Sequence, residues 1–416
     1  MIAPTLGDMF RSFGRIGILS FGGPAAQIAL MHKVLVEEKG WLDERTFLNA
    51  LSFTMLLPGP EAMQLATFAG WKLRGTSGGL LAGLLFVLPG AAVIALLATI
   101  YALFGDVPLV ATLFIGIKAV IVVIVLEALL RVARKALSSP FYWAIAGLSF
   151  AAIFDLHLPF PLIIAAAAAL GYLAARSGPP APPAPRVEGT LRTIAIWLSL
   201  WIAPILALWA SGATFLTDLA LFFSRLAVVT FGGAYAVLAY MTQEVVMTKN
   251  WLTTAQMIDG LGLAETTPGP LILVTEFVGF IAGYAAGGMA LAFAAALVTL
   301  WVTFVPCFLW IFAGAPYIER LTHMPRLSAA LKAITAAVVG VILNLSLWFS
   351  AHVFFGNLGE FRMGPVQLIA PELSSLQILP SVIALGALVL MTIGKQSLER
   401  TLAFGATAAL VSSWIP

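Results

Sequence analysis

The residues of this chain that could form a binding site belong to two short Gly- and Pro-containing motifs, and each motif occurs twice. Phe21-Gly22-Gly23 and Pro58-Gly59-Pro60 recur as Phe231-Gly232-Gly233 and Pro268-Gly269-Pro270, at a constant offset of 210 residues. All four motifs fall in apolar stretches, where Gly and Pro interrupt helices. Two matched broken helices are the best sequence indication of a transporter's binding site. We therefore expect the motifs to line a site for a transported solute.

The composition of the chain places these motifs in a membrane protein. Of its 416 residues, 61% are hydrophobic and 10% are charged, and the mean hydropathy is +1.01. Soluble domains carry roughly 25% charged residues. A transmembrane helix needs about 20 mostly apolar residues, so the chain has room for a dozen or so such helices. The composition predicts an all-α polytopic membrane protein.

The chain consists of two copies of one unit. An ungapped comparison of residues 13–60 with residues 223–270 gives 16 identities in 48 positions, including Arg15 with Arg225. A Pro-rich tract and a further apolar segment separate the copies, and such a tract is typical of an exposed linker. We predict a first repeat over residues 1–176 (the first copy), a linker with a connecting transmembrane helix over 177–211, and a second repeat over 212–416 (the second copy).

The apolar segments predict about thirteen transmembrane spans, six in each copy and one in the connecting segment. Because the connecting segment crosses the membrane once, the second copy would have the opposite orientation in the membrane. The six-span repeats would therefore be inverted, with broken helices at the repeated motifs. The charges agree with this topology. If the N-terminus is cytoplasmic, the cytoplasmic loops carry 15 of the 22 basic residues. Such an excess of Lys and Arg is the positive-inside signature.

Other functional classes lack their motifs in this sequence. There is no phosphate-binding P-loop, because Gly394-Lys395 is followed by Gln396 and lacks the upstream Gly. There is no HExxH zinc motif and no nucleophile elbow. The single Cys307 cannot form an internal disulfide, and the His residues show no metal-ligand spacing. We therefore predict neither an enzyme nor a resident metal or cofactor.

Taken together, the motifs resemble those of a known family. Phe21-Gly22-Gly23-Pro24-Ala25-Ala26-Gln27, Leu57-Pro58-Gly59-Pro60-Glu61 and Glu265-Thr266-Thr267-Pro268-Gly269-Pro270 are similar to the paired signatures of the chromate ion transporter family, in its long bidomain form. The resemblance covers essentially the whole chain, although the second copy has Ala234 where the first has Pro24.

The resemblance implies a function and a location. It implies a multi-pass protein of the bacterial inner membrane that exports chromate, is driven by the proton motive force and confers chromate resistance. Its partners would be chromate, sulfate as a look-alike anion, protons as the coupling ion and membrane lipid, with a homodimer left open and no nucleic acid. The same residues could instead serve an uptake carrier for sulfate or another oxyanion, or a passive anion channel.

Broken helices suit a tetrahedral dianion because helix N-termini offer free backbone N–H groups and a favourable dipole. Gly lets the backbone approach an anion closely, and Pro is well placed at the start of a half-helix. The alternative is that these positions are kinks that only shape packing. The motif residues that we predict to bind substrate are Gly22, Gly23, Pro58, Gly59, Pro60, Gly232, Gly233, Pro268, Gly269 and Pro270.

Four basic residues in or near the spans are further candidates for binding substrate. Burying such a charge near the bilayer centre costs at least about 2.5 to 3.5 kcal/mol. Lys118 and Lys332 lie at equivalent spans of the two copies and could supply positive charge, or could extend to the interface. Arg15 and Arg225 lie eight residues before the second Gly of their motifs and could hold an oxyanion with two hydrogen bonds, or could anchor an interface.

The acids differ between the copies. Glu61 follows the first Pro-Gly-Pro where the second copy has Leu271, and Glu265 precedes the second where the first copy has Met55. A proton-coupled carrier needs a group that is neutral in one state and charged in another, and partial burial raises the pKa of Glu toward that range. Glu61 and Glu265 are our candidates, ahead of three other acids. The alternative is that the acids pair with the bases and cap half-helices. The three further acids are Glu127, Asp259 and Glu276.

Six glycines at four-residue spacing predict close packing of helices instead of contact with substrate. Small residues at this spacing form one face of a helix, so another backbone can approach it. The six are Gly75, Gly79, Gly83, Gly279, Gly283 and Gly287.

Overall fold

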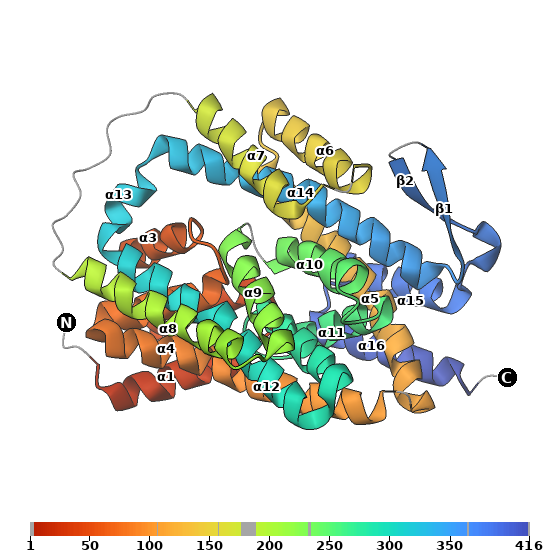
Figure 1. Ribbon diagram of the computed structural model, residues 1–416, viewed down its shortest axis with the longest axis horizontal. Coiled ribbons are helices and arrows are strands. Elements are labelled where there is room, and N and C mark those ends of the chain that lie inside the picture. The colour runs from red at the N-terminus through yellow and green to blue at the C-terminus, as the bar shows by residue number, and fades with distance from the viewer. Residues whose placement is uncertain are drawn as a thin grey trace. The chain divides into compact units, whose positions relative to one another are not determined.

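The computed structural model is almost entirely helical (Figure 1). It describes residues 4–105, 107–156, 158–175, 189–231, 234–363 and 366–414. Gly232, Gly233 and the Pro-rich tract of the predicted linker lie outside these residues. The chain divides into two compact units, and each unit takes segments from both copies. The units are therefore units of packing, and the boundaries of the sequence repeats stay a prediction.

The first unit comprises Met1–Thr99, Arg176–Ala234 and Thr267–Ser328. Within it α12 packs against α8 and α9, and α8 packs against α9. Figure 1 shows these helices side by side in green and cyan. Its elements are α1 (Leu6–Leu19), α2 (Gly23–His32), η1 (Lys33–Glu38), α3 (Glu44–Thr54), α4 (Glu61–Phe104), α8 (Thr190–Ala210), α9 (Thr214–Val229), η3 (Leu271–Leu273), α12 (Val274–Gly314), η4 (Ala315–Tyr317) and α13 (Ile318–Thr322).

The second unit comprises Ile100–Ala175, Tyr235–Thr266 and Ala329–Pro416. Its centre is α5, which packs against α11, α15 and α16, and α6 packs against α7. Its elements are α5 (Pro108–Ala136), α6 (Pro140–Phe154), α7 (Phe160–Ala174), α10 (Ala234–Thr242), η2 (Gln243–Thr248), α11 (Thr254–Thr266), α14 (Pro325–Phe354), β1 (Leu358–Met363), β2 (Val366–Pro371), η5 (Leu373–Ser375), α15 (Ile378–Thr392) and α16 (Leu398–Ser412).

The helices break where the sequence predicts. Between α1 and α2 the backbone is left-handed at Gly22, with φ 81°. Pro58–Pro60 is non-helical between α3 and α4, with Gly59 at φ 117°. Pro268–Pro270 is likewise non-helical between α11 and η3, with Gly269 at φ 90°. Pro cannot continue a helix, and Gly takes up these positive φ angles without strain, so the sequence accounts for all three breaks.

The longest helices, α4 and α12, each fold back on themselves at a glycine. Gly75 has φ 62° and ψ −152°, and Gly288 has φ 76° and ψ −166°, both far from helical values. A Cβ atom on Gly70 would meet the carbonyl oxygen of Gly78, so the two arms of α4 are in contact just beyond the turn. Each turn therefore joins two apolar helical arms within one long element.

Most of the glycines at four-residue spacing pack closely against neighbouring groups, but the prediction is wrong for Gly75, which has open space around it and forms the turn in α4. A Cβ on Gly79 would lie 2.5 Å from Cε1 of Phe312, and one on Gly83 would lie 2.6 Å from Cε1 of Phe308. A Cβ on Gly283 would lie 2.7 Å from the carbonyl oxygen of Leu291. The prediction of a packing role is confirmed for these positions.

Within the residues that the structure describes, five helical segments are long and apolar enough to cross a membrane, and three shorter apolar helices accompany them. The count of thirteen spans and the inverted orientation stay predictions, because the breaks divide several expected spans into helices shorter than a bilayer crossing. The five segments are Glu61–Phe104, Pro108–Ala136, Thr190–Ala210, Leu271–Leu321 and Pro325–Phe354, and the three shorter helices are Pro140–Phe154, Phe160–Ala174 and Ile378–Thr392.

One element departs from the all-helical expectation. Strands β1 and β2 form an antiparallel hairpin in which Leu358 lies opposite Pro371 and Met363 lies opposite Val366. The hairpin follows the second unit's longest helix, α14, in a stretch too polar for a span. A Gly-Pro dipeptide in this stretch is a turn signal that the search for apolar spans does not use.

Candidate functional site

Two backbone hydrogen bonds join the broken helices of the two copies. The N–H of Gly269 donates to the carbonyl oxygen of Ser20 at 2.9 Å, and the N–H of Gly59 donates to the carbonyl oxygen of Thr230 at 2.8 Å. We call the first contact crossing one and the second crossing two. Ser20 and Thr230 are matched positions of the repeats, and so are Gly59 and Gly269. A reciprocal exchange of this kind is what a two-fold relation between the copies generates.

The residue before each Phe-Gly-Gly motif is a hydroxyl residue that closes the preceding helix. Ser20 Oγ donates to the carbonyl oxygen of Ile16 at 2.6 Å, and Thr230 Oγ1 donates to that of Leu226 at 2.5 Å. Both side chains are buried. Because Ser20 and Thr230 are the C-caps of α1 and α9, their backbone carbonyls have no donor within the helix and are available to the glycine of the other copy.

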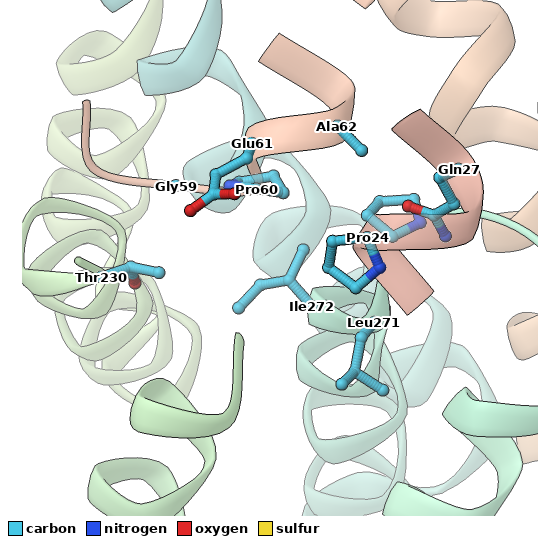
Figure 2. Close-up of a pocket in the computed structure, with 10 residues that line it drawn as sticks. Pro24, Gln27, Gly59, Pro60, Glu61, Ala62, Thr230, Leu271 and Ile272 are labelled. Atoms are coloured by element: carbon cyan, nitrogen blue, oxygen red, sulfur yellow. The ribbon is translucent and has the colours of Figure 1, made fainter. Parts of the chain in front are cut away.

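A small cavity of about 20 Å³ is lined by residues of both crossings (Figure 2). A cavity that holds one water has a volume of about 10 to 15 Å³ by the same measure, so in this conformation the cavity holds little more than a water. Crossing one contributes Pro24, Gln27, Pro270, Leu271 and Ile272, and crossing two contributes Gly59, Pro60, Glu61, Ala62 and Thr230.

Three half-helices begin at this cavity. Pro24 lies in the first turn of α2, Glu61 and Ala62 begin α4, and Leu271 and Ile272 begin η3, which leads directly into α12. The first four N–H groups of a helix have no partner within the helix, and the helix dipole places positive potential there. Three such ends around one cavity form a place where an anion is favoured over a cation or a neutral group.

The amide and the carboxylate at the cavity both come from the first copy. Gln27 and Glu61 line it, whereas their counterparts Val237 and Leu271 are apolar. Figure 2 shows the Glu61 carboxylate on the side of the cavity where Thr230 lies. The first copy thus supplies a carboxylate, an amide and the first turns of α2 and α4, and the second copy supplies Thr230, the first turn of η3 and apolar surface.

Of the residues that sequence analysis predicts to bind substrate, Gly59, Pro60 and Pro270 line the cavity. Gly22 is the N-cap of α2, five residues before Gln27, and Gly23 is the first residue of that helix. Pro58, Pro268 and Gly269 lie in the same breaks without lining the cavity. Of the two predicted proton carriers, Glu61 lines the cavity.

The four basic candidates do not line this cavity. In the second unit Lys118 forms an ion pair with the buried Asp259, with 3.2 Å between Nζ and Oδ1, and Tyr101 donates to Asp259 Oδ2 at 2.8 Å. Arg15 is exposed and pairs with Glu38 at 3.2 Å. The side chains of the other two candidates, Arg225 and Lys332, are exposed.

Glu265 has a partner that the sequence analysis did not consider. Its Oε1 accepts a hydrogen bond of 2.6 Å from the hydroxyl of Tyr235, and the Glu265 side chain is buried. Tyr235 follows the second Phe-Gly-Gly motif where the first copy has Ala25. Both members of this pair are thus specific to the second copy, and a comparison of the copies for polar residues present in only one would have identified them.

The same comparison would have identified Gln27, and the pair Ser20 and Thr230 could have been identified as hydroxyl residues at matched positions. Gln27 belongs to the motif that carries the family resemblance, but the sequence assigns it no contact. Its long-range bond to Gly269 of the second copy becomes visible only in the fold.

Comparisons with known proteins agree with the repeat. The chain is 28% identical over 373 residues to a probable chromate transport protein of Synechococcus elongatus, covering 88% of this chain and 90% of the relative. It is 30% identical over 347 residues to the chromate transport protein of Pseudomonas aeruginosa, covering 80% and 79%. It is 28% identical over 345 residues to the chromate transport protein of Cupriavidus metallidurans, covering 81% of each.

No solved structure is significantly similar to this chain. The sequence model of the chromate transporter family matches it in two segments, residues 7–172 and 217–412, one in each copy. The chain therefore belongs to the chromate transporter family.

Proposed function

We propose that this protein is a secondary active transporter that exports chromate across the bacterial inner membrane and thereby confers chromate resistance. The observation that carries the proposal is the convergence of three half-helix N-termini on one cavity built by both copies. Membership of the family, whose relatives are named chromate transport proteins, supports chromate as the substrate.

A tetrahedral dianion needs hydrogen-bond donors and positive potential. Helix ends supply both from the backbone, so no metal and no buried basic side chain is required at the cavity. Because the cavity holds little more than a water in this conformation, the half-helices must separate for the anion to bind. The two crossings are the contacts that such a motion would alter, and alternating access commonly moves one repeat against the other.

Glu61 is the proposed coupling residue at the site. An ionised carboxylate beside a dianion is repulsive, whereas a protonated one can donate a hydrogen bond. Protonation of Glu61 would therefore favour binding of the anion, and loss of that proton would favour the empty carrier. Glu265, which is buried and hydrogen-bonded to Tyr235, is the second proposed proton carrier. It precedes its Pro-Gly-Pro motif whereas Glu61 follows its own, so it would act at a different step of the cycle.

The proposed roles of the basic residues follow from where they lie. Lys118 balances the charge of Asp259 within the second unit, and we propose that this pair maintains the position of α11, the helix that leads to the second Pro-Gly-Pro. Arg15, Arg225 and Lys332 are exposed, and we propose that they draw the oxyanion toward the site over a distance.

The proposed topology is that of two inverted six-span repeats and one connecting helix, thirteen spans in all, with a cytoplasmic N-terminus. The reciprocal crossings support a two-fold relation between the copies. The excess of basic residues in alternate loops supports the inverted arrangement and the orientation. A homodimer is compatible with this arrangement, and two proteins in one membrane would each contain a complete cavity.

Transport into proteoliposomes tests the proposed function. Purified protein in vesicles with an imposed pH gradient should accumulate labelled chromate against its concentration gradient, and dissipating the gradient should stop the accumulation. Sulfate and molybdate, tested in the same vesicles, report the preference among oxyanions. Chromate flux that ignores the pH gradient would favour a passive channel, and accumulation of sulfate without chromate would favour a sulfate carrier.

A further inference from the structure

Gln27 carries a buried hydrogen-bond acceptor at the cavity. The side chain is 2% exposed, and Nε2 donates to the carbonyl oxygens of Ser20, at 3.2 Å, and Gly269, at 2.7 Å. Carbonyl oxygens only accept, so the amide nitrogen must face these two groups and Oε1 must face away from them. Figure 2 shows the amide oxygen turned toward the other residues that line the cavity.

Oε1 of Gln27 has no hydrogen-bond partner among the residues that the structure describes. Burying an acceptor without a donor is unfavourable, and native proteins rarely leave such an atom without a function. The donor that completes this group is therefore expected to be a molecule that enters the cavity.

The fold does not require glutamine at this position. In crossing two the bond from Gly59 to Thr230 forms at 2.8 Å with Val237 in the place of Gln27. Val237 is fully buried, so an apolar side chain is accommodated at the matched position of the second copy. Gln27 must accordingly serve a function that crossing one has and crossing two lacks.

The chemistry of the cavity combines backbone donors with side-chain acceptors. The first turns of α2, α4 and η3 offer N–H groups, whereas Gln27 Oε1 can only accept and the Glu61 carboxylate accepts whenever it is ionised. A fully ionised tetrahedral anion such as sulfate has only acceptor oxygens and cannot satisfy Oε1. An oxyanion that retains one hydrogen, such as hydrogen chromate or hydrogen phosphate, satisfies the donors with its bare oxygens and Oε1 with its O–H group.

We propose that Gln27 makes the site select tetrahedral oxyanions that carry a hydrogen over those that carry none, by accepting the O–H hydrogen at Oε1. This inference rests on the proposed function and adds the form of the substrate to it. Chromate takes up a proton near neutral pH and sulfate does not, so Gln27 separates the substrate from its look-alike. A protein that leaves a buried polar group unpaired in the wrong complex can discriminate strongly against that ligand.

Competition at equilibrium tests the assignment without any pH gradient. Labelled chromate is bound to the purified protein in detergent at neutral pH, where part of the chromate carries a hydrogen, and is displaced by phosphate or by sulfate. At this pH every phosphate ion carries at least one hydrogen, and its hydrogen phosphate form has the charge and shape of sulfate and differs by its hydrogen. The unmodified protein should bind hydrogen phosphate about tenfold or more tightly than sulfate, the factor expected when a buried acceptor is left unpaired.

Two substitutions remove the acceptor, and a third serves as the control. Gln27→Val copies the second repeat and Gln27→Met keeps the length of the side chain, and both should bring the phosphate-to-sulfate ratio close to one. Gln64→Met should leave the ratio unchanged. Gln64 is also fully buried, also has an unpartnered Oε1 among the described residues and also donates to a backbone carbonyl, that of Pro58, but it does not line the cavity.

The outcomes separate this assignment from the proposed function. Equal displacement by phosphate and sulfate in the unmodified protein would overturn the role of Gln27 even if neither variant folds. An unchanged preference in folded Gln27→Val would overturn it as well. If chromate shows no saturable binding to the unmodified protein, the proposed function itself fails and the assignment of Gln27 fails with it.

Discussion

The backbone N–H of Gly59 is bonded to the carbonyl oxygen of Thr230, 2.8 Å away in the other copy of the repeat. The matched bond from Gly269 to Ser20 uses the second Pro-Gly-Pro glycine in the same way. In this conformation the two glycine N–H groups thus join the copies to each other. The donors left for an anion are those in the first turns of the half-helices that follow, beginning at Glu61 and Leu271.

The substitution Gly59→Ala should destabilise the protein. Gly59 has φ 117°, and a Cβ would lie 2.8 Å from Nε2 of Gln64 and 2.9 Å from Sγ of Cys307. Strain of this kind costs on the order of 1 to 3 kcal/mol. Thermal unfolding of the purified protein in detergent should show a clear loss of stability. Gly147→Ala is the matched control, because Gly147 lies in α6 with open space around it. Equal melting temperatures for Gly59→Ala and the unmodified protein would contradict the geometry of crossing two.

Crossing two also predicts an order among substitutions of Thr230. Thr230→Ser keeps the hydroxyl that the first copy has at Ser20, so it should retain the bond to the Leu226 carbonyl and change stability little. Thr230→Val removes a buried hydrogen bond that is worth about 1 kcal/mol. In chemical or thermal unfolding, the Thr230→Val protein should be less stable than the Thr230→Ser protein. The reverse order would show that the hydroxyl at position 230 does not stabilise the end of α9.

The pair of Lys118 and Asp259 predicts a rescue by double substitution. Lys118→Met should lower the amount of folded protein, because it leaves a buried carboxylate without its cation, at a cost of about 3 to 5 kcal/mol. Adding Asp259→Asn should restore much of that amount. The measurement is monodisperse protein recovered from membranes, with Lys332→Met, at an exposed position, as the control. A Lys118→Met protein that folds normally but no longer binds chromate would instead make Lys118 a substrate ligand.

The acids specific to one copy predict unequal defects in coupling. Glu61→Gln removes a titratable group at the cavity, so accumulation of chromate against its gradient should be lost while exchange of chromate for chromate continues. Glu265→Gln keeps an acceptor for the Tyr235 hydroxyl but also removes a titratable group, and we expect a smaller loss. Both fluxes are measured in proteoliposomes with and without a pH gradient. Identical behaviour of both variants and the unmodified protein would exclude coupling through these residues.

His32 gives the first unit a pH dependence that can be measured. The hydrogen bond with Glu44 raises the pKa of His32 above its ordinary value of 6.5, and Glu37 adds to the effect. A raised folded-state pKa contributes stability that is fully present below about 6.5 and is lost as the pH rises through the folded-state value. Unfolding temperature should therefore decline over that interval, and Glu44→Gln should reduce the decline. A steeper decline in Glu44→Gln would contradict the pairing.

The sequence predicts the breaks correctly because Gly and Pro act locally. The non-helical backbone at Pro58–Pro60 follows from the missing N–H groups and the ring clashes of two prolines, whatever surrounds them. The close packing at Gly79 and Gly83 is likewise foreseen, since spacing alone puts them on one helix face.

The composition of the site could not be foreseen to the same degree, because it depends on contacts between distant segments. Lys118 appears in the sequence as an unpaired charge, and only the packing of α5 against α11 brings it to Asp259. Gln27 is an ordinary polar residue until the fold places its amide between Ser20 and Gly269. The reciprocal hydrogen bonds of the crossings also depend on contact between the two copies, and no single copy contains them.

The most direct test of the central claim is to locate bound chromate by anomalous X-ray diffraction at the chromium absorption edge. The account predicts an anomalous peak among the first turns of α2, α4 and η3, next to Pro24, Glu61 and Leu271, with the cavity wider than in the present conformation. A chromium peak beside Lys118, with none at the half-helix ends, would contradict the claim that the anion is held by the broken helices.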